Sequence, residues 1–517
     1  MLNMQLNNSG TDMVIKFIVL IVYFAFMIGI GMFFFKRNES HSDYILGGRQ
    51  LNVWVAALSA QASDMSGWLL LGLPGLAYLI GGVSEAIWTA IGLAIGTYLN
   101  WLIVAKRLRK YTQIAGDSLT LPDFLTNRFK SENPTLRIVG ALFILVFFTI
   151  YTASGFVSGA KLFNQVFNVP YVWAVLISLF VIVAYTFLGG FKAVCWTDLF
   201  QGLLMFFAII IVPILAIASL GGVGPAFGSI GEFHLLPGGG PNSFTTLGII
   251  SAIAWGLGYF GQPHILVRFM AIRSSKEVRP ARIIAMVWVI IALAAAVLVG
   301  IFGAPYLAKY GIVLTGGDTE KVFMYMIDHM FGPVLAGVFL SAILAAIMST
   351  ADSQLLVTAS AVSSDIYKVV TKKKASEKKL IWVSRAAVIV VAIVAGIIAL
   401  DENSVIFSLV SYAWAGFGAT FGPLVLFALF WKRCNYAGAV AGVLTGGITA
   451  IVWKSLPAIV GFFTGTSDVV LPTFFQIYEI IPGFVLSSVA IIVVSLLTAP
   501  PSKAITDEFD SIKTAQV

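Results

Sequence analysis

Long apolar runs with almost no charge recur along the whole chain, and they constrain its fold more than any other feature. A membrane-crossing helix needs roughly 20 apolar residues, and only helices or closed barrels satisfy their backbone hydrogen bonds in lipid. The runs are continuous and not alternating, so they predict helices and not barrel strands. We expect an all-α integral membrane protein in a lipid bilayer, with about 13 transmembrane helices near 13–35, 51–80, 84–105, 137–166, 171–190, 193–218, 243–268, 283–308, 332–368, 380–400, 404–431, 436–460 and 476–498.

Composition and charge exclude several other classes. Hydrophobic residues make up 59% of the 517 residues and charged ones 11%, whereas soluble domains carry about 25% charged residues. The net charge of +8 does not indicate nucleic-acid binding, because the basic residues lie in short loops between apolar runs. Cys195 and Cys434 are far apart and have no metal-ligand partner nearby. Neither a disulfide nor a zinc site is expected.

The placement of Lys and Arg predicts the orientation, since cytoplasmic loops carry the excess of both. With the N-terminus outside and the C-terminus cytoplasmic, 27 of the 32 Lys and Arg residues lie in cytoplasmic segments: 36–49, 105–137, 188–192, 268–282, 368–385, 432–433 and the tail 501–517. The first run is too long for a signal peptide, and no basic segment precedes it. We further expect an irregular outer loop at 219–242, a short surface helix within 309–331 and a poorly ordered tail.

The run 51–80 is interrupted at 59–68, SAQASDMSGW, where polar and small residues surround Asp64. Intramembrane charges are costly and usually functional. Unwinding of the helix here would free backbone carbonyls for a small cation and place a positive helix end near a carboxylate. The alternative is a buried Asp64 held by a structural partner.

Two further runs carry similar interruptions. In 251–263, SAIAWGLGYFGQP, glycines and Pro263 predict a second helix break, with Trp255 and Tyr259 one turn apart. The GLGYFG match lacks the strand that a nucleotide-binding loop requires, and close aromatic packing is the alternative. In 341–354, SAILAAIMSTADSQ, spacing places Ala346, Ser349 and Thr350 on one helix face. Their oxygens suit sodium, although such hydroxyls often bond their own helix.

The breaks fall in the second and seventh predicted helices. Corresponding helices are therefore offset by five, an odd number, so the two halves have opposite topology. Paired broken helices in inverted halves indicate a transport site. We expect one domain over 1–517, with an extra first helix at 13–35, a first repeat at 50–218, an inverted second repeat at 243–431 and two additional helices within 436–498.

The chain resembles the sodium:solute symporter family, and within it the members that carry proline. The runs that carry the resemblance are DYILGGR (43–49), ALSAQASDMSGWLLLGLPG (57–75), LTLPDF (119–124), FFTIYTASG (147–155), WTD (196–198), WGLGYFGQPHILVRFMA (255–271), LSAILAAIMST (340–350), LVSYAWAGFGA (409–419) and YEIIPGF (478–484). The family's fold is a LeuT-like five-plus-five inverted repeat with two broken helices. This agrees with the positions of the two breaks.

The resemblance also implies roles for individual residues. A sodium site would use the carbonyls of Ala62, Met65 and Ala346 and the hydroxyls of Ser349 and Thr350, with Asp64 and Ser63 in support. An L-proline site would be lined by Ser66, Gly67, Trp68, Tyr151, Trp255, Tyr259, Gln262 and Pro263. Arg49 matches a position tied to coupling and inward gating, although a topology-setting charge explains it nearly as well. Asp198 is either structural or part of an ion exit path. Gln61 and Asp352 depart from the closest relatives and leave any second ion site open.

The implied function is sodium-coupled uptake of L-proline by alternating access in a bacterial cytoplasmic (inner) membrane, with Na+ as coupling ion and no other cofactor. Another solute of the family (a different amino acid, pantothenate or a sugar) is the nearest alternative, although a sugar would need more amide and carboxylate groups at the breaks. A channel would need a continuous polar pore, and a sensor would need a soluble output domain. The four histidines are scattered, so no enzyme is predicted. The sequence does not indicate an oligomeric state.

Overall fold

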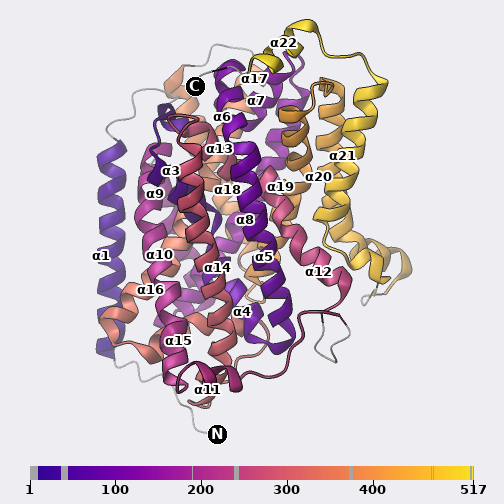
Figure 1. The fold of residues 1–517 in the computed structure, drawn as a ribbon. Helices are drawn as coiled ribbons and strands as arrows, with labels where there is room; N and C mark the ends of the chain where they lie inside the picture. Colours follow the sequence, from indigo (N-terminus) through magenta and orange to yellow (C-terminus); the bar gives the residue numbers. More distant parts are fainter. Residues whose placement is uncertain are drawn as a thin grey trace.

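The computed structural model describes residues 10–35, 45–188, 190–237, 244–371, 376–466, 469, 471–512 and 515. These residues form helices, connecting segments and one isolated bridge between Leu51 and Ile272. The first residues of the DYILGGR run (43–49) lie outside this part of the chain. Long helices run between the two ends of the molecule (Figure 1).

Eleven elements form the continuous scaffold. They are α1 (Gly10–Phe35), α5 (Val83–Leu99), α8 (Thr135–Phe167), α9 (Tyr171–Leu188), α10 (Phe191–Ser219), α14 (Val278–Ala308), α16 (Pro333–Ser360), α18 (Glu377–Ile398), α19 (Ile406–Phe430), α20 (Tyr436–Thr464) and α21 (Ile480–Leu497).

Two further membrane segments are broken. The first consists of α3 (Val53–Asp64), the π-helix η2 (Trp68–Gly72) and α4 (Leu73–Tyr78), and the second of α12 (Thr246–Ile253), the 3-10 helix η5 (Ala254–Gly261) and α13 (Pro263–Ala271). Both helix breaks predicted from the sequence are confirmed.

Shorter elements connect these helices. They are η1 (Gly47–Arg49), η3 (Ile80–Gly82), η4 (Asn100–Val104), α6 (Ala105–Ile114), α7 (Leu121–Arg128), α11 (Val223–Gly228), η6 (Gly316–Lys321), α15 (Val322–Met330), η7 (Ala361–Tyr367), α17 (Lys368–Thr371), η8 (Thr473–Gln476) and α22 (Lys503–Ser511).

Local sequence explains where several helices begin. Asn52 accepts a hydrogen bond from the Val55 amide at the start of α3, and Thr245 accepts one from the Gly248 amide at the start of α12. These side chains satisfy amides that have no partner within the helix. Pro263 begins α13, where its missing N–H is not needed.

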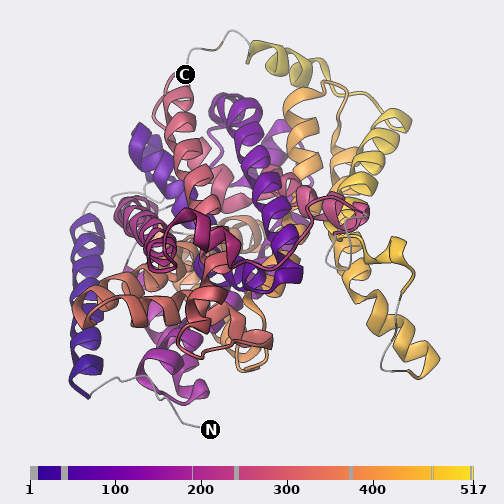
Figure 2. The same cartoon turned by 60° about the horizontal axis from the view of Figure 1, so that its bottom comes forward.

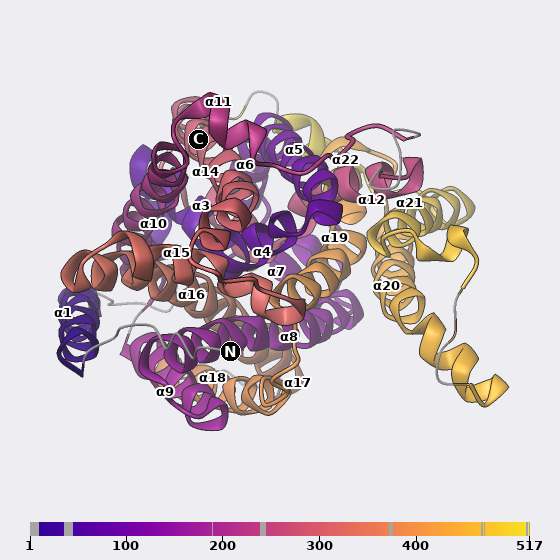
Figure 3. The same ribbon diagram turned by 90° about the horizontal axis from the view of Figure 1, so that it is seen from below.

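Ten helices among the described residues are long and apolar enough to cross a membrane, and shorter apolar helices lie at Trp68–Tyr78, Tyr171–Ala184 and Thr246–Gly261. The total of about 13 transmembrane helices stays a prediction. In the apolar stretches of α16 and α19, 83% of the residues are buried inside the protein, against 22% in those of α1 and α20. Accordingly α16 and α19 are central helices, whereas α1 lies at one edge and α20 with α21 at another (Figure 3). The C-terminal part of α20 projects away from the central helices (Figures 2 and 3).

Three expectations about the connections need correction. The tail contains the helix α22, whose Phe509 packs against the Arg107 and Arg128 guanidinium groups. The short helix expected within 309–331 is α15, but it is largely buried and not a surface helix. The connection 219–242, which was expected to be irregular, contains α11, and its residues 238–242 lie outside the described part of the chain.

Candidate functional site

The first break begins where α3 ends at Asp64. Met65 follows with φ −85° and ψ 76°, and helical bonding resumes at Trp68. Gly67 is required in this turn, because a Cβ there would lie 2.3 Å from the Ser158 hydroxyl oxygen. Side-chain crowding from α8 and the small residues of the break therefore fix its shape together.

The second break packs closely against α19. The 3-10 helix η5 passes to an extended Gln262 and then to Pro263. A Cβ on Gly258 would lie 1.9 Å from Trp414 Nε1, and one on Gly261 would lie 2.3 Å from the Phe417 carbonyl oxygen. The glycines thus both interrupt the helix and admit α19 at close range. The two interpretations of this segment are compatible.

Asp64 is where the two breaks meet. Its Oδ2 accepts a 2.7 Å hydrogen bond from the Tyr259 hydroxyl. Its backbone carbonyl accepts one from Trp68 Nε1 at 3.1 Å and one from the Tyr151 hydroxyl at 3.2 Å. Asp64 is fully buried, and its Oδ1 has no hydrogen-bond partner within the described residues. A buried carboxylate is costly without a partner, so this oxygen is suited to a cation or a solute ammonium group.

The predicted sodium residues on α16 face the end of α3. The Ala62 carbonyl accepts hydrogen bonds from the Ser349 hydroxyl at 2.8 Å and the Thr350 hydroxyl at 3.3 Å. Ser349 also donates to the Ala346 carbonyl at 3.3 Å. Met65 lies at the end of the same break and is fully buried. Carbonyl and hydroxyl oxygens are the ligands that hard cations prefer, and here they converge between two helices.

Ser63 and Ser66 are oriented differently from each other. Ser63 donates to the Ser59 carbonyl in its own helix at 2.5 Å. Ser66 lies inside the break, and its hydroxyl accepts a long 3.4 Å bond from the Trp68 amide. Ser66 is therefore the hydroxyl inside the break itself, whereas Ser63 bonds back to its own helix.

Aromatic rings from both breaks form a cluster. The ring centroids of Trp68 and Trp255 are 6.4 Å apart, and those of Tyr259 and Trp414 are 4.9 Å apart. Trp414 Nε1 donates to the Trp255 carbonyl at 2.8 Å, and Gln262 Nε2 donates to the Trp414 carbonyl at 3.2 Å. Trp414 was not among the residues predicted for the site, although it lies in the run LVSYAWAGFGA (409–419).

Two spaces approach this cluster from opposite ends of the molecule. One, named the inner cavity after the predicted orientation, has a volume of ≈ 20 Å³, lies toward α7 and is lined in part by Pro263, Arg268 and Ser353. The other, named the outer pocket in the same way, has a volume of ≈ 350 Å³ and is lined in part by Trp255 and Lys454. Pro263 and Trp255 therefore border different spaces, and the fully buried Asp64 lies in the same helix-break region.

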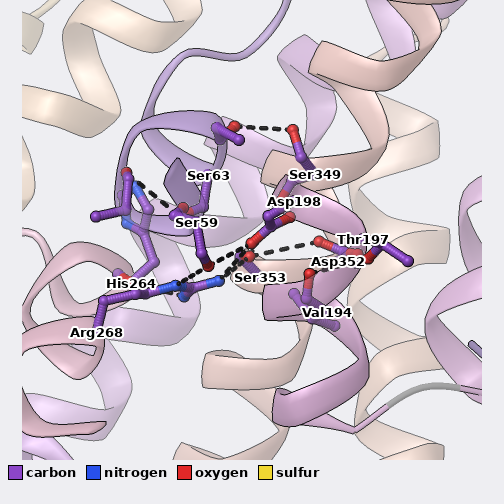
Figure 4. A network of polar contacts seen from close by, with 12 residues as sticks. Ser59, Ser63, Val194, Thr197, Asp198, His264, Arg268, Ser349, Asp352 and Ser353 are labelled. Atoms are coloured by element: carbon purple, nitrogen blue, oxygen red, sulfur yellow. Dashed lines mark hydrogen bonds and ion pairs between the residues drawn. The ribbon is translucent and has the colours of Figure 1, made fainter. Parts of the chain in front are cut away.

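A buried ion pair lies close to the predicted sodium residues (Figure 4). Asp198 Oδ2 accepts from the Ser59 hydroxyl at 2.6 Å and from Arg268 Nη2 at 3.2 Å. Arg268 also donates to the Ser353 hydroxyl at 2.6 Å. The neighbouring Asp352 accepts a 3.4 Å bond from Ser353. Removing one partner of such a pair costs about 3–5 kcal/mol, so the network has at least a structural role.

Arg268 lies in a buried helix and not in a loop, contrary to the prediction. It falls in the predicted cytoplasmic segment 268–282, but α13 continues to Ala271 and the Arg268 side chain is 1% exposed. Its carboxylate partner comes from α10, 70 residues earlier in the chain. Local hydropathy cannot reveal such a partner; a lone cation directly after an apolar segment was the available signal.

Arg49 bridges three segments near the end of the molecule that carries α7. It donates to Asp117 at 2.9 Å, to the Thr112 hydroxyl at 3.1 Å, to the Ser118 carbonyl at 2.8 Å and to the Met270 carbonyl at 2.7 Å. Burial lowers the pKa of the Arg49 guanidinium, and the charge of Asp117 opposes that shift. Arg49 thus ties the start of the first broken segment to the end of the second.

Comparison with known proteins defines the class. The sequence model of the sodium:solute symporter family matches residues 44–446, and the chain belongs to this family. It is 48% identical over 489 residues to the high-affinity proline transporter PutP of Bacillus subtilis (strain 168). The aligned region covers 94% of this chain and 98% of that protein. It is 46% identical over 508 residues to the sodium/proline symporter of Escherichia coli (strain K12), covering 97% and 96% respectively.

A solved structure supports the fold. The substrate-bound, outward-open state of a Na+-coupled sialic acid symporter matches with a TM-score of 0.74 and 21% identity, over 95% of this chain and 99% of that one. The expected LeuT-like all-α fold is confirmed. The chain is a multi-pass membrane transporter, and sodium is the coupling ion of its family.

Proposed function

We propose that this protein takes up L-proline together with sodium by alternating access. The observation that carries the proposal is the position of Ala62 and Asp64 on the same break. The Ala62 carbonyl faces the hydroxyls of Ser349 and Thr350, and Asp64 accepts from Tyr259 only two residues later. An ion that rearranges one end of this short segment changes the other end, which is the physical requirement for coupled binding.

Sodium would bind between α3 and α16. The carbonyls of Ala62, Met65 and Ala346 and the hydroxyls of Ser349 and Thr350 would be its ligands. In this geometry the two hydroxyls donate to carbonyls. Binding would turn both hydroxyl oxygens toward the ion and free the Ala62 carbonyl to coordinate it. Asp64 would add negative charge from the same break without being a direct ligand.

Proline would bind beside the Asp64 break. Its ring is apolar and would fit against Trp68, Trp255 and Tyr259. The rings of Trp68 and Trp255 lie next to each other, and the Tyr259 hydroxyl donates to Asp64. The remaining residues of this site would be Ser66, Gly67, Tyr151, Gln262 and Pro263. Gly67 leaves no room for a side chain toward α8, and Tyr151 holds the Asp64 carbonyl.

Movement of sodium inward would supply the driving force. A membrane potential of 100 mV contributes about 2.3 kcal/mol for each charge that crosses. The outer pocket and the inner cavity approach the site from opposite ends, as alternating access requires. Release toward the inner cavity would pass Arg268 and Ser353, and the pairing of Arg268 with Asp198 links that path to the sodium region.

We place the protein in the bacterial cytoplasmic membrane, with the N-terminus outside and the C-terminus in the cytoplasm. The Lys and Arg distribution supports this orientation. Arg49 would then act at the cytoplasmic side before inward opening. Its bond to Met270 joins the two broken segments, and its bonds to Thr112, Asp117 and Ser118 tie them to α6 and the α6–α7 connection. The repeat boundaries 50–218 and 243–431 belong to the same proposal.

The solute itself is tested by competition. Radiolabelled proline uptake is measured in cells that lack their own proline uptake and express this protein, with unlabelled proline, another amino acid, pantothenate or a sugar in excess. We expect inhibition by proline alone. Strong inhibition by one of the other solutes, with weak inhibition by proline, would assign the site to that solute and contradict the proposal.

A further inference from the structure

One continuous helix lies against the second broken segment. It comprises η3, α5, η4 and α6 and runs over Ile80–Ile114, with α5 packed on η5 and α6 packed on α13. A Cβ on Gly96 would lie 2.3 Å from the Gly256 carbonyl oxygen, and one on Gly256 would lie 2.4 Å from the Gly92 carbonyl oxygen. One turn after Gly96, the helix passes into the π-helix η4 at Asn100. Such π-helical turns are rare and frequent at functional sites, which makes Asn100 a candidate for a role in transport.

Asn100 supplies a hydrogen bond that the second break cannot make for itself. In a continuous helix the Tyr259 carbonyl would accept from the amide four residues later, but that residue is Pro263, which has no N–H. Asn100 Nδ2 donates to this carbonyl at 2.9 Å. Backbone groups that a proline frees inside a membrane need such a partner from a neighbouring helix. The Asn100 side chain therefore replaces the missing amide.

The other end of the Asn100 amide indicates that stability alone does not explain this residue. Asn100 is 1% exposed, and its Oδ1 is buried without a hydrogen-bond partner in the described part of the chain. An unpaired buried acceptor costs at least as much free energy as a typical hydrogen bond contributes. The gain from the Nδ2 bond is thereby offset, so its benefit lies in the position that it gives to Tyr259.

Tyr259 is held from two sides. Its carbonyl is fixed by Asn100, and its hydroxyl donates to Asp64 Oδ2 at 2.7 Å. Its ring lies 4.9 Å from the ring of Trp414, measured between centroids. Because the tyrosine ring is rigid, a displacement of the Tyr259 backbone moves the hydroxyl with it. Hydrogen bonds weaken steeply when their geometry is lost, so the Asp64 bond depends on where the backbone is held.

We propose that Asn100 is a positioning residue for coupled transport. By holding the Tyr259 carbonyl, it keeps the Tyr259 hydroxyl within reach of Asp64, and it thereby maintains the link between the proposed solute site and the proposed sodium site. In this role it touches neither solute nor ion and acts through Tyr259. The inference rests on the proposed function and adds the side chain that holds one end of the link in place.

The test asks whether the effects of two substitutions combine. Asn100→Leu removes the donor at nearly constant size, and Tyr259→Phe removes the hydroxyl. Sodium-driven uptake of radiolabelled L-proline is measured in proteoliposomes for the parent, both single variants and the double variant, at varied sodium and varied proline. Asn164→Leu is the matched control. Asn164 Nδ2 also donates to a backbone carbonyl, that of Val169 at 2.9 Å, but it lies near the end of α8 and not in either break.

We expect half-saturating sodium and half-saturating proline to rise together in Asn100→Leu, by about fivefold, because the contribution of one hydrogen bond is lost. In Tyr259→Phe the bond to Asp64 is already absent. The double variant should therefore match Tyr259→Phe, since two residues that act through the same bond do not have additive effects. Asn164→Leu should keep the values of the parent.

Two results overturn the role of Asn100 and leave the proposed function standing. One is a set of half-saturation values in Asn100→Leu that equals those of the parent, whatever the maximal rate. The other is a double variant whose values lie about fivefold above those of Tyr259→Phe, as for independent sites. If Asn100→Leu does not fold, Asn100→Ala takes its place, and loss of folded protein in both assigns Asn100 a structural role alone. A parent that does not transport proline with sodium contradicts the proposed function and this inference together.

Discussion

The hydroxyl of Tyr259 donates a 2.7 Å hydrogen bond to the carboxylate of Asp64, and this bond joins the two broken helices. The bond crosses 195 residues of sequence. Tyr259 belongs to the proposed solute site and Asp64 supports the proposed sodium site, so the bond connects the two sites directly.

Removal of that hydroxyl tests the link. In Tyr259→Phe, Asp64 loses the donor to its carboxylate, and a hydrogen bond to a charged group contributes about 1.5–3 kcal/mol. We expect half-saturating sodium and half-saturating proline both to rise about tenfold or more. The control is Tyr98→Phe, since Tyr98 is 43% exposed on α5. An increase for proline alone would show that Tyr259 does not act through the ion.

The hydroxyl face of α16 gives a second prediction. Ser349→Ala removes the 2.8 Å donor to Ala62 and one proposed sodium ligand, so the sodium concentration that half-activates uptake should rise about tenfold. Sodium should also raise the melting temperature of the parent, because a ligand stabilises the state that binds it, and raise it less in the variant. Ser341→Ala is the control, as Ser341 donates to the Gly337 carbonyl within α16. Equal sodium dependence in both variants would remove Ser349 from the site.

Gly67 tests the shape of the break. In Gly67→Ala the new Cβ would lie 2.3 Å from the Ser158 oxygen and 2.7 Å from the Ser158 Cβ, so α8 and the break must separate. We expect uptake to be almost lost. The double variant Gly67→Ala, Ser158→Gly removes both clashes and should recover a large part of the activity. Failure of this rescue would mean that the conformation of Gly67, and not its contact with Ser158, is required.

Arg49 and Asp117 should differ in importance although they form an ion pair. Asp117 has a 66% exposed side chain, and exposed ion pairs contribute about 0–1 kcal/mol. Asp117→Asn should therefore leave uptake nearly unchanged. Arg49→Gln loses the bonds to Ser118 and Met270 as well, and its uptake should fall about tenfold or more, because several charge-assisted bonds are lost together. If both substitutions lowered uptake equally, Arg49 would act only through its ion pair with Asp117. The initial uptake rate at fixed protein content is the measurement.

The sequence predicted the elements that depend on local composition. Both breaks follow from Ser, Gly and Pro within apolar runs, and the face formed by Ala346, Ser349 and Thr350 follows from helical spacing. That Ser349 meets Ala62 across 287 residues could only be inferred from the family resemblance. Local pattern contains no information on such long-range contacts.

The features that were missed depend on partners distant in the chain. Arg268 was assigned to a loop because its partner Asp198 lies on another helix. The tail was expected to lack order because its own residues are polar, yet Phe509 packs on Arg107 and Arg128 from other elements. In each case a tertiary contact determines the local structure.

Sodium-driven uptake is the central claim, and it is measured most directly in proteoliposomes. Radiolabelled L-proline uptake by the parent and by Asp64→Cys is compared with and without an inward sodium gradient. We predict accumulation by the parent in the gradient, little without it, and a large loss of sodium-driven uptake in Asp64→Cys. Parent uptake that is indifferent to the gradient would contradict sodium coupling, and normal sodium-driven uptake by Asp64→Cys would remove Asp64 from the mechanism.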